Sequence, residues 1–105
     1  MSDAPHRYEK IEQNLREAIA AILKETGEQQ KDLTKLLGHR SLTMVSRRQR
    51  GTTSWEISEV GLLATHWQMP VGALFEGRNA ALQALPPERA AQLRHSKEAP
   101  VLQAA

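Results

Sequence analysis

The sequence contains no cysteine, and only two tryptophans, one tyrosine and one phenylalanine occur among its 105 residues. The absence of cysteine excludes a disulfide framework and any site built on a thiolate. Runs of apolar residues are only a few residues long, far below the roughly 20 that a membrane span needs. The opening segment, MSDAPHRYEK, has no apolar core of the kind found in a signal peptide. We therefore expect a cytoplasmic chain with one small, thin core.

Acidic residues are missing from Leu33 to Trp55, although five basic residues fall there. The rest of the chain has nine basic and twelve acidic residues, so the formal net charge of +2 conceals a concentrated positive segment. Such a segment predicts a surface that meets a polyanion. A membrane-binding segment would instead be a longer basic amphipathic helix, which this sequence lacks.

Apolar residues recur at intervals of three and four and predict an all-α protein of five helices. We expect the first helix from Tyr8 to Thr26, ended by Gly27, and the second from Gln29 to Leu37, ended by Gly38. The inward residues of the first helix are expected to be Ile11, Leu15, Ala18, Ile19, Ile22 and Leu23.

A third helix of about nine residues is expected between Ser41 and Gly51, with the Ser41 hydroxyl capping its first turn. Val45 is its clear inward residue, and the aliphatic stem of Arg48 can add packing. A helix so short and so poor in apolar residues is not stable alone. It must therefore be held by its neighbours, with its polar side free.

A fourth helix is expected to begin with a capping box between Thr53 and Glu56, or with Ser54 as the cap. Its buried residues are expected to be Trp55, Val60, Leu63, Ala64 and Trp67. Pro70 suits the first turn of a fifth helix, which returns Met69, Leu74 and Phe75 to the core.

Beyond Gly77 the sequence is rich in alanine, so we divide the chain into a domain of residues 1–77 and a tail of residues 78–105. Two interpretations of the tail stay open. It either forms a helix over residues 86–97, begun by its paired prolines, or is loosely ordered.

Two helices joined by a tight, glycine-containing turn, with a basic second helix, form a helix-turn-helix pattern. In GEQQKDLTKLLG, TMVSRRQRG and LLATHWQMPVGAL, the sequence resembles the lambda-repressor and Cro-like (XRE) family of DNA-binding domains. The resemblance covers residues 14–76. It implies a five-helix fold whose third helix enters the DNA major groove.

The sequence departs from the family pattern in three places. The turn from Gly38 to Val45 is one residue longer than usual, and Thr34 replaces a small alanine. Arg48 and Gln49 stand where the family usually has an apolar residue and a glutamate. The register of the third helix is therefore open, because Met44 can replace Val45 as its core residue.

Ten residues of the second helix, the turn and the third helix are the candidate DNA contacts. The arginines are expected to neutralise phosphates, although any one can bind a guanine edge instead. The first turn of the third helix is apolar and suits thymine methyl groups, unless its side chains pack on the second helix. Gln30 matches a family glutamine that typically bonds a phosphate. The candidates are Gln30, Arg40, Ser41, Leu42, Thr43, Met44, Ser46, Arg47, Arg48 and Arg50.

Catalysis, a metal and a cofactor are not expected. His6, His39, His66 and His95 are scattered, without a spacing typical of a metal site. The sequence has neither a glycine-rich phosphate loop nor a nucleophile elbow.

The first hypothesis is a transcriptional regulator that binds double-stranded operator DNA, most like a phage or prophage repressor or Cro-type protein in the cytoplasm of a bacterial host. It would act as a homodimer joined through its C-terminal part, or as a monomer. The second hypothesis is a protein-interaction module, such as the antitoxin of a toxin–antitoxin pair, whose tail is disordered until it wraps a partner.

Overall fold

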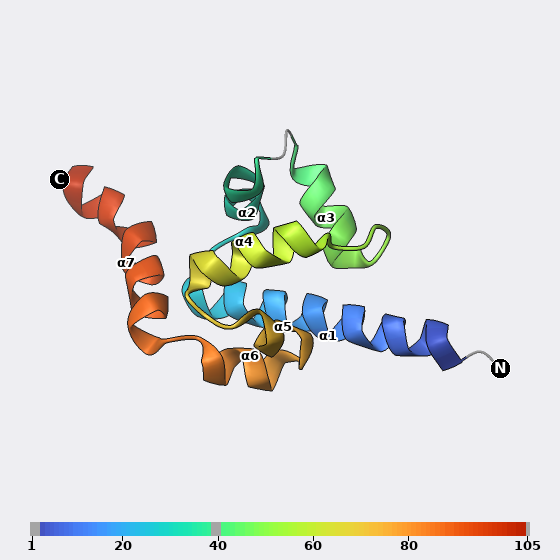
Figure 1. Cartoon of the computed structure of the whole chain (residues 1–105). Coiled ribbons are helices and arrows are strands. Elements are labelled where there is room, and N and C mark those ends of the chain that lie inside the picture. Colours follow the sequence, from blue (N-terminus) through green and yellow to red (C-terminus); the bar gives the residue numbers. More distant parts are fainter. Residues whose placement is uncertain (1–2, 39–40, 105) are drawn as a thin grey trace.

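The structure, a computed structural model, describes the backbone of residues 3–38 and 41–104 and the side chains of residues 9–38 and 41–97. This part of the chain is all-helical, as predicted, and contains no strand (Figure 1). It has seven helices where five were expected. They are α1 (Asp3–Thr26), α2 (Gln30–Leu37), α3 (Leu42–Arg50), α4 (Ile57–Trp67), α5 (Val71–Phe75), α6 (Arg78–Ala84) and α7 (Pro87–Ala104).

The long helix α1 is the element on which the others pack. In Figure 1, α4 runs above it, α5 and α6 lie below it, and α2 and α3 stand beyond α4. Its inward residues Ile19 and Ile22 are fully buried, together with Leu33 of α2, Leu63 of α4 and Leu74 of α5. Ile11, which was expected to face inward, is 43% exposed because α1 extends there beyond the elements that cover it.

The core continues into α6 and α7, in the segment that was assigned to the tail. Ala81 is fully buried, and Leu85, Ala90 and Leu93 belong to the same cluster. The Asn14 side chain of α1 donates a hydrogen bond to the Phe75 carbonyl at 3.2 Å, which holds the connection into α6 against α1. The helix predicted over residues 86–97 is thus present as α7, and the loosely ordered alternative is wrong for residues 78–97.

The predicted ends of α2 and α3 are confirmed. Gly38 and Gly51 terminate these helices with φ values of 73° and 85°, in the left-handed region that glycine adopts without strain. Ser41 holds the N-cap position of α3, but its side chain makes no cap bond there. The Met44 amide instead bonds the Ser41 carbonyl at 3.3 Å.

The capping box predicted at Thr53 is wrong. Helix α4 begins at Ile57, with Glu56 as its N-cap and Glu59 as the reciprocal partner. The Trp55 indole of the preceding non-helical segment donates to Gln49 at 2.9 Å. The Ser54 hydroxyl, the other proposed cap, donates to Glu12 of α1 at 2.9 Å.

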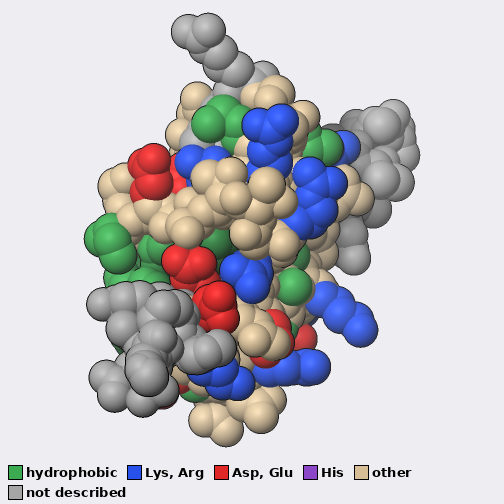
Figure 2. Space-filling view, turned by 90° about the vertical axis from the view of Figure 1, so that its right-hand side faces the viewer, with side chains coloured by type: hydrophobic (Ala, Val, Ile, Leu, Met, Phe, Trp, Pro, Cys, Tyr) green, Lys and Arg blue, Asp and Glu red, His purple; other side chains and the backbone are tan. Residues whose placement is uncertain are grey.

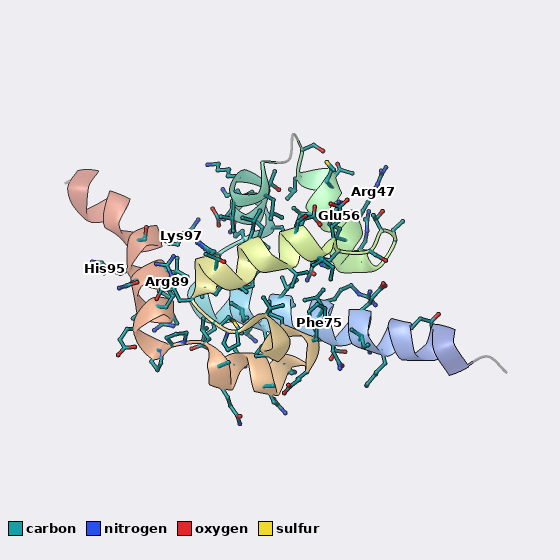
Figure 3. The ribbon with its side chains drawn as sticks, viewed as in Figure 1. Arg47, Glu56, Phe75, Arg89, His95 and Lys97 are labelled. Atoms are coloured by element: carbon teal, nitrogen blue, oxygen red, sulfur yellow. The ribbon has the colours of Figure 1, made fainter. Side chains whose placement is uncertain are left out.

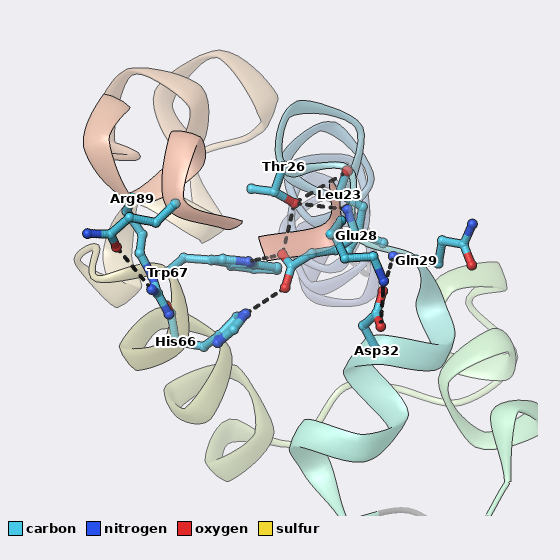
Figure 4. A network of polar contacts seen from close by, with 10 residues as sticks. Leu23, Thr26, Glu28, Gln29, Asp32, His66, Trp67 and Arg89 are labelled. Atoms are coloured by element: carbon cyan, nitrogen blue, oxygen red, sulfur yellow. Dashed lines mark hydrogen bonds and ion pairs between the residues drawn. The ribbon is translucent and has the colours of Figure 1, made fainter. Parts of the chain in front are cut away.

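A buried polar network fixes the corner between α1 and α2 (Figure 4). The Glu28 carboxylate accepts bonds from the Thr26 hydroxyl and the Trp67 indole, each at 2.8 Å, and lies 2.6 Å from Nε2 of His66. Burial raises the pKa of Glu28, but the hydrogen bonds from His66, Trp67 and Thr26 more than offset this, so its pKa is lowered. The corner that starts α2 is therefore bonded to the end of α4.

Helix α7 is tied to the same corner. Arg89 donates to the His66 carbonyl at 2.8 Å, and Lys97 contacts both carboxylate oxygens of Asp32, the N3 residue of α2, at 3.0 and 2.9 Å. Figure 3 shows both side chains on the side of α7 that faces the other helices, with His95 on the opposite side. The pKa of Asp32 is lowered although its partial burial acts to raise it, because Lys97 and the Gln29 amide bond its charged form.

We predict that Glu28→Gln destabilises the fold by about 1–3 kcal/mol at pH 7, because it removes a carboxylate that accepts buried hydrogen bonds. A lowered folded-state pKa gives stability that is present above the usual value of 4.5 and is lost as pH falls through the folded value. The difference in the free energy of unfolding between the wild type and Glu28→Gln should therefore be smaller at pH 3 than at pH 7. Urea unfolding at pH 7 and pH 3 measures it, with exposed Glu76→Gln as the control. A deficit that is equal at both pH values would contradict this account.

Candidate nucleic-acid interface

Helix α3 is attached to the domain by one apolar residue and two polar ones. Val45 is fully buried against a core that includes Leu33 of α2. Arg48 and Gln49 follow Val45 by three and four positions, so all three lie on one side of the helix. Val45, and not Met44, is therefore the core residue of α3, because Met44 is 37% exposed.

Arg48 lies inside the domain, where the sequence-based prediction placed it on the DNA-facing surface. It is only 6% exposed, and its Nε donates to Oε1 of Glu59 on α4 at 2.7 Å. Its Nη1 donates to the Met44 carbonyl at 3.3 Å, and its Nη2 lies 3.9 Å from Glu56. The cause is helical register, since Arg48 shares the inward side with Val45. A buried, paired guanidinium cannot neutralise a phosphate, so we exclude Arg48 from the interface.

Gln49 makes the second polar attachment. Its Nε2 donates to the Arg16 carbonyl of α1 at 3.1 Å, and its Oε1 accepts the Trp55 indole. Sequence reasoning did not assign these contacts, although the departure from the family pattern at Arg48 and Gln49 marked the same two positions. Together the two side chains bind α3 to α1, to α4 and to the segment between α3 and α4.

The opposite side of α3 is open to solvent. Thr43, Arg47 and Arg50 lie at i, i+4 and i+7, which places them along one stripe, and all three are exposed. Leu42 is 48% exposed at the start of the helix, and Ser46 is half-buried. Leu42 and Met44 are 48% and 37% exposed, so neither side chain is fully covered by α2.

Arg47 and Arg50 have no salt-bridge or hydrogen-bond partner for their side chains among the described residues. Figure 3 shows Arg47 pointing away from α3 into solvent. The face that carries the end of α3 is drawn in Figure 2, where Lys and Arg side chains extend over its middle and right. Acidic side chains lie mostly towards its left. The charge of this face is thus available to an external anion.

The remaining candidates are less well placed. Gln30 is the first residue of α2 and is half-buried, while Ser41 is exposed at the N-cap of α3. Arg40 lies outside the described residues, as does His39.

In the described part of the chain, no group of three His, Asp or Glu side chains is arranged to hold a metal ion. None of the described helices has the length and apolar character of a membrane span.

Comparisons with known protein families, with curated proteins and with solved structures find no match to this chain.

We predict that Arg48→Met lowers the free energy of unfolding by about 3–5 kcal/mol, because it breaks a buried ion pair by removing the guanidinium that donates to Glu59. Arg47→Met removes the same charge one residue earlier and should change stability by less than about 0.5 kcal/mol. Urea denaturation of both variants, and of the double variant Arg48→Met with Glu59→Leu, makes the comparison. The double variant should recover part of the loss, and equal effects of Arg47→Met and Arg48→Met would contradict the assignment.

Proposed function

We propose that the protein is a sequence-specific, double-stranded DNA-binding transcriptional regulator of the phage or prophage repressor type. The observation that carries the proposal is that the three arginines of α3 differ in burial and pairing. Arg48 is buried against Glu59, whereas Arg47 and Arg50 are exposed and pair with no carboxylate of the described residues. Outward cations with no internal partner suit an external polyanion.

The dimensions of α3 agree with a major-groove helix. An α-helix with its side chains is about 10–12 Å in diameter, and the major groove is about 12 Å wide. Its first turn offers the exposed side chains of Leu42, Thr43 and Met44. Two of these are apolar and can meet thymine methyl groups, and the hydroxyl of Thr43 can bond a base edge.

The arrangement of α2 and α3 also supports a helix-turn-helix of the lambda-repressor and Cro-like type. Leu33 of α2 and Val45 of α3 are both fully buried, and a left-handed glycine ends α2 at the turn. In such an arrangement the first helix crosses the DNA backbone. Gln30, at the start of α2, then approaches a phosphate. The protein acts by binding and not by catalysis.

The second hypothesis, an interaction module such as an antitoxin, rested on a tail that is disordered until bound. Residues 78–84 and 87–97 are helical, and this segment contributes Ala81, Leu85, Ala90 and Leu93 to the core. We therefore propose only the DNA-binding function. The symmetry of sites selected from a random duplex pool would report the number of subunits, since half-sites of a dimer lie about 34–36 Å apart.

We predict that duplex affinity falls steeply with salt and that Arg47→Ala and Arg50→Ala each make the slope shallower. One lost phosphate contact changes the slope of log affinity against log salt by about 0.9. Fluorescence anisotropy between 50 and 200 mM salt measures the slope. The matched control is Arg78→Ala, which removes the same charge from α6 and should leave the slope unchanged. A wild-type affinity that does not depend on salt would refute the proposal.

A further inference from the structure

Arg16 of α1 holds its guanidinium flat against the backbone at the end of α3. A side-chain carbon added to Gly51 would lie 3.0 Å from Cζ, 3.2 Å from Nη1 and 3.3 Å from Nη2 of Arg16. The central carbon Cζ is the nearest of the three atoms to the added side-chain carbon, and the two nitrogens are almost equally distant from it. The guanidinium therefore turns its flat face, and not its edge, towards Gly51. Its N–H groups lie in the plane of the group and therefore point away from that contact.

The edges of this guanidinium are not used within the described residues. No hydrogen bond or salt bridge of the Arg16 side chain is found there, and the side chain is half-buried. Glu12, one turn earlier on α1, accepts the Ser54 hydroxyl instead. The Arg16 carbonyl accepts Gln49, which fixes the backbone of α1 beside α3. The group is thus held in place by packing, with five donors in a planar fork.

The charges around Gly51 favour an anion. Arg47 and Arg50 precede Gly51 on α3, and the exposed residues Thr52 and Thr53 follow it. The carbonyls at the end of α3, which carry the negative end of the helix dipole, accept the amides of residues 51–53. Arg47 and Arg50 thus add positive charge on the helix that ends at Gly51, and the Glu12 carboxylate of α1 is bonded to Ser54.

The position of Arg16 also suits the proposed orientation of α3. If the first turn of α3 lies in the major groove, its last residue lies about 13 Å further along the helix. The phosphates of both strands border the groove along this length, so the end of α3 would lie near a sugar-phosphate backbone.

We propose that Arg16 is a phosphate-binding residue, which extends the DNA interface from the helix-turn-helix to α1. The ligand is a backbone phosphodiester, bound by the guanidinium fork of Arg16 beside Arg47 and Arg50. This proposal rests on the proposed function. It adds a contact that the helix-turn-helix pattern of α2 and α3 does not include.

The test compares duplex binding by the wild type, Arg16→Gln, Arg16→Lys and Lys24→Gln. Arg16→Gln should make the salt slope shallower by about 0.9, which corresponds to about 3.5-fold less loss of affinity between 50 and 200 mM salt. Arg16→Lys keeps the charge and should keep the slope. Lys24→Gln removes an exposed charge from the same helix, close to Arg78, and should behave as the wild type. Circular dichroism of each variant checks that the fold is intact.

If the wild type binds duplex and Arg16→Gln retains the full slope, the proposal is overturned while the DNA-binding function stands. If the wild type does not bind duplex, titration with inorganic phosphate at constant ionic strength decides. Saturable shifts of the Arg16 Nε and Gly51 amide resonances, lost in Arg16→Gln, would support the anion site without the DNA function. The absence of these shifts would overturn both proposals.

Discussion

The ion pair between Arg48 and Glu59 determines which side of α3 reaches solvent. Two charges are removed from water at a cost of several kcal/mol, and only close geometry with further hydrogen bonds offsets it. The 2.7 Å contact, the bond from Arg48 to the Met44 carbonyl and the bond from the Glu56 amide to Glu59 supply that geometry. Of these three bonds, the one between Arg48 and Glu59 joins α3 to α4, so a rotation of α3 about its axis would break it and separate two buried opposite charges. The pair therefore fixes the rotation of α3 more strictly than Val45 does alone.

Helices α2 and α3 are held at two places by polar contacts that involve other elements. At the start of α2, the Glu28 network links the α1–α2 corner to His66 and Trp67 of α4. At the end of α3, Gln49 bonds α1 and Trp55. The side chains of Leu33 and Val45 fill the space between these attachments. A thin apolar core is sufficient for this task because the polar contacts set the orientation of the two helices.

Local patterns in the sequence predicted the elements that are determined locally. Periodicity predicted α1 and α2, and the signals at Ser41 and Gly51 predicted α3. Gly38 and Gly51 marked the ends of α2 and α3, because the left-handed backbone that glycine adopts is a local property. Helix α6 was missed because its packing depends on alanines such as Ala81, whose small apolar surface gives a weak periodic signal.

The side-chain roles were harder to predict. Arg47 and Arg48 are adjacent and chemically identical, and only a partner eleven residues later in the chain separates them. Arg16 is even more distant in the sequence from the residue that it contacts, because it meets Gly51 only through the packing of α1 beside α3. A one-dimensional pattern identifies a basic segment, but the fold decides which of its charges are available.

The most direct test of this division is a nuclear magnetic resonance titration of the protein with a duplex, observing the Nε–Hε signals of the arginines. We expect the signals of Arg47 and Arg50 to shift as duplex is added, while the signal of Arg48 stays in place because its Nε is bonded to Glu59. A shift of Arg48 as large as those of its neighbours, or no shift of Arg47 and Arg50 upon binding, would contradict the account.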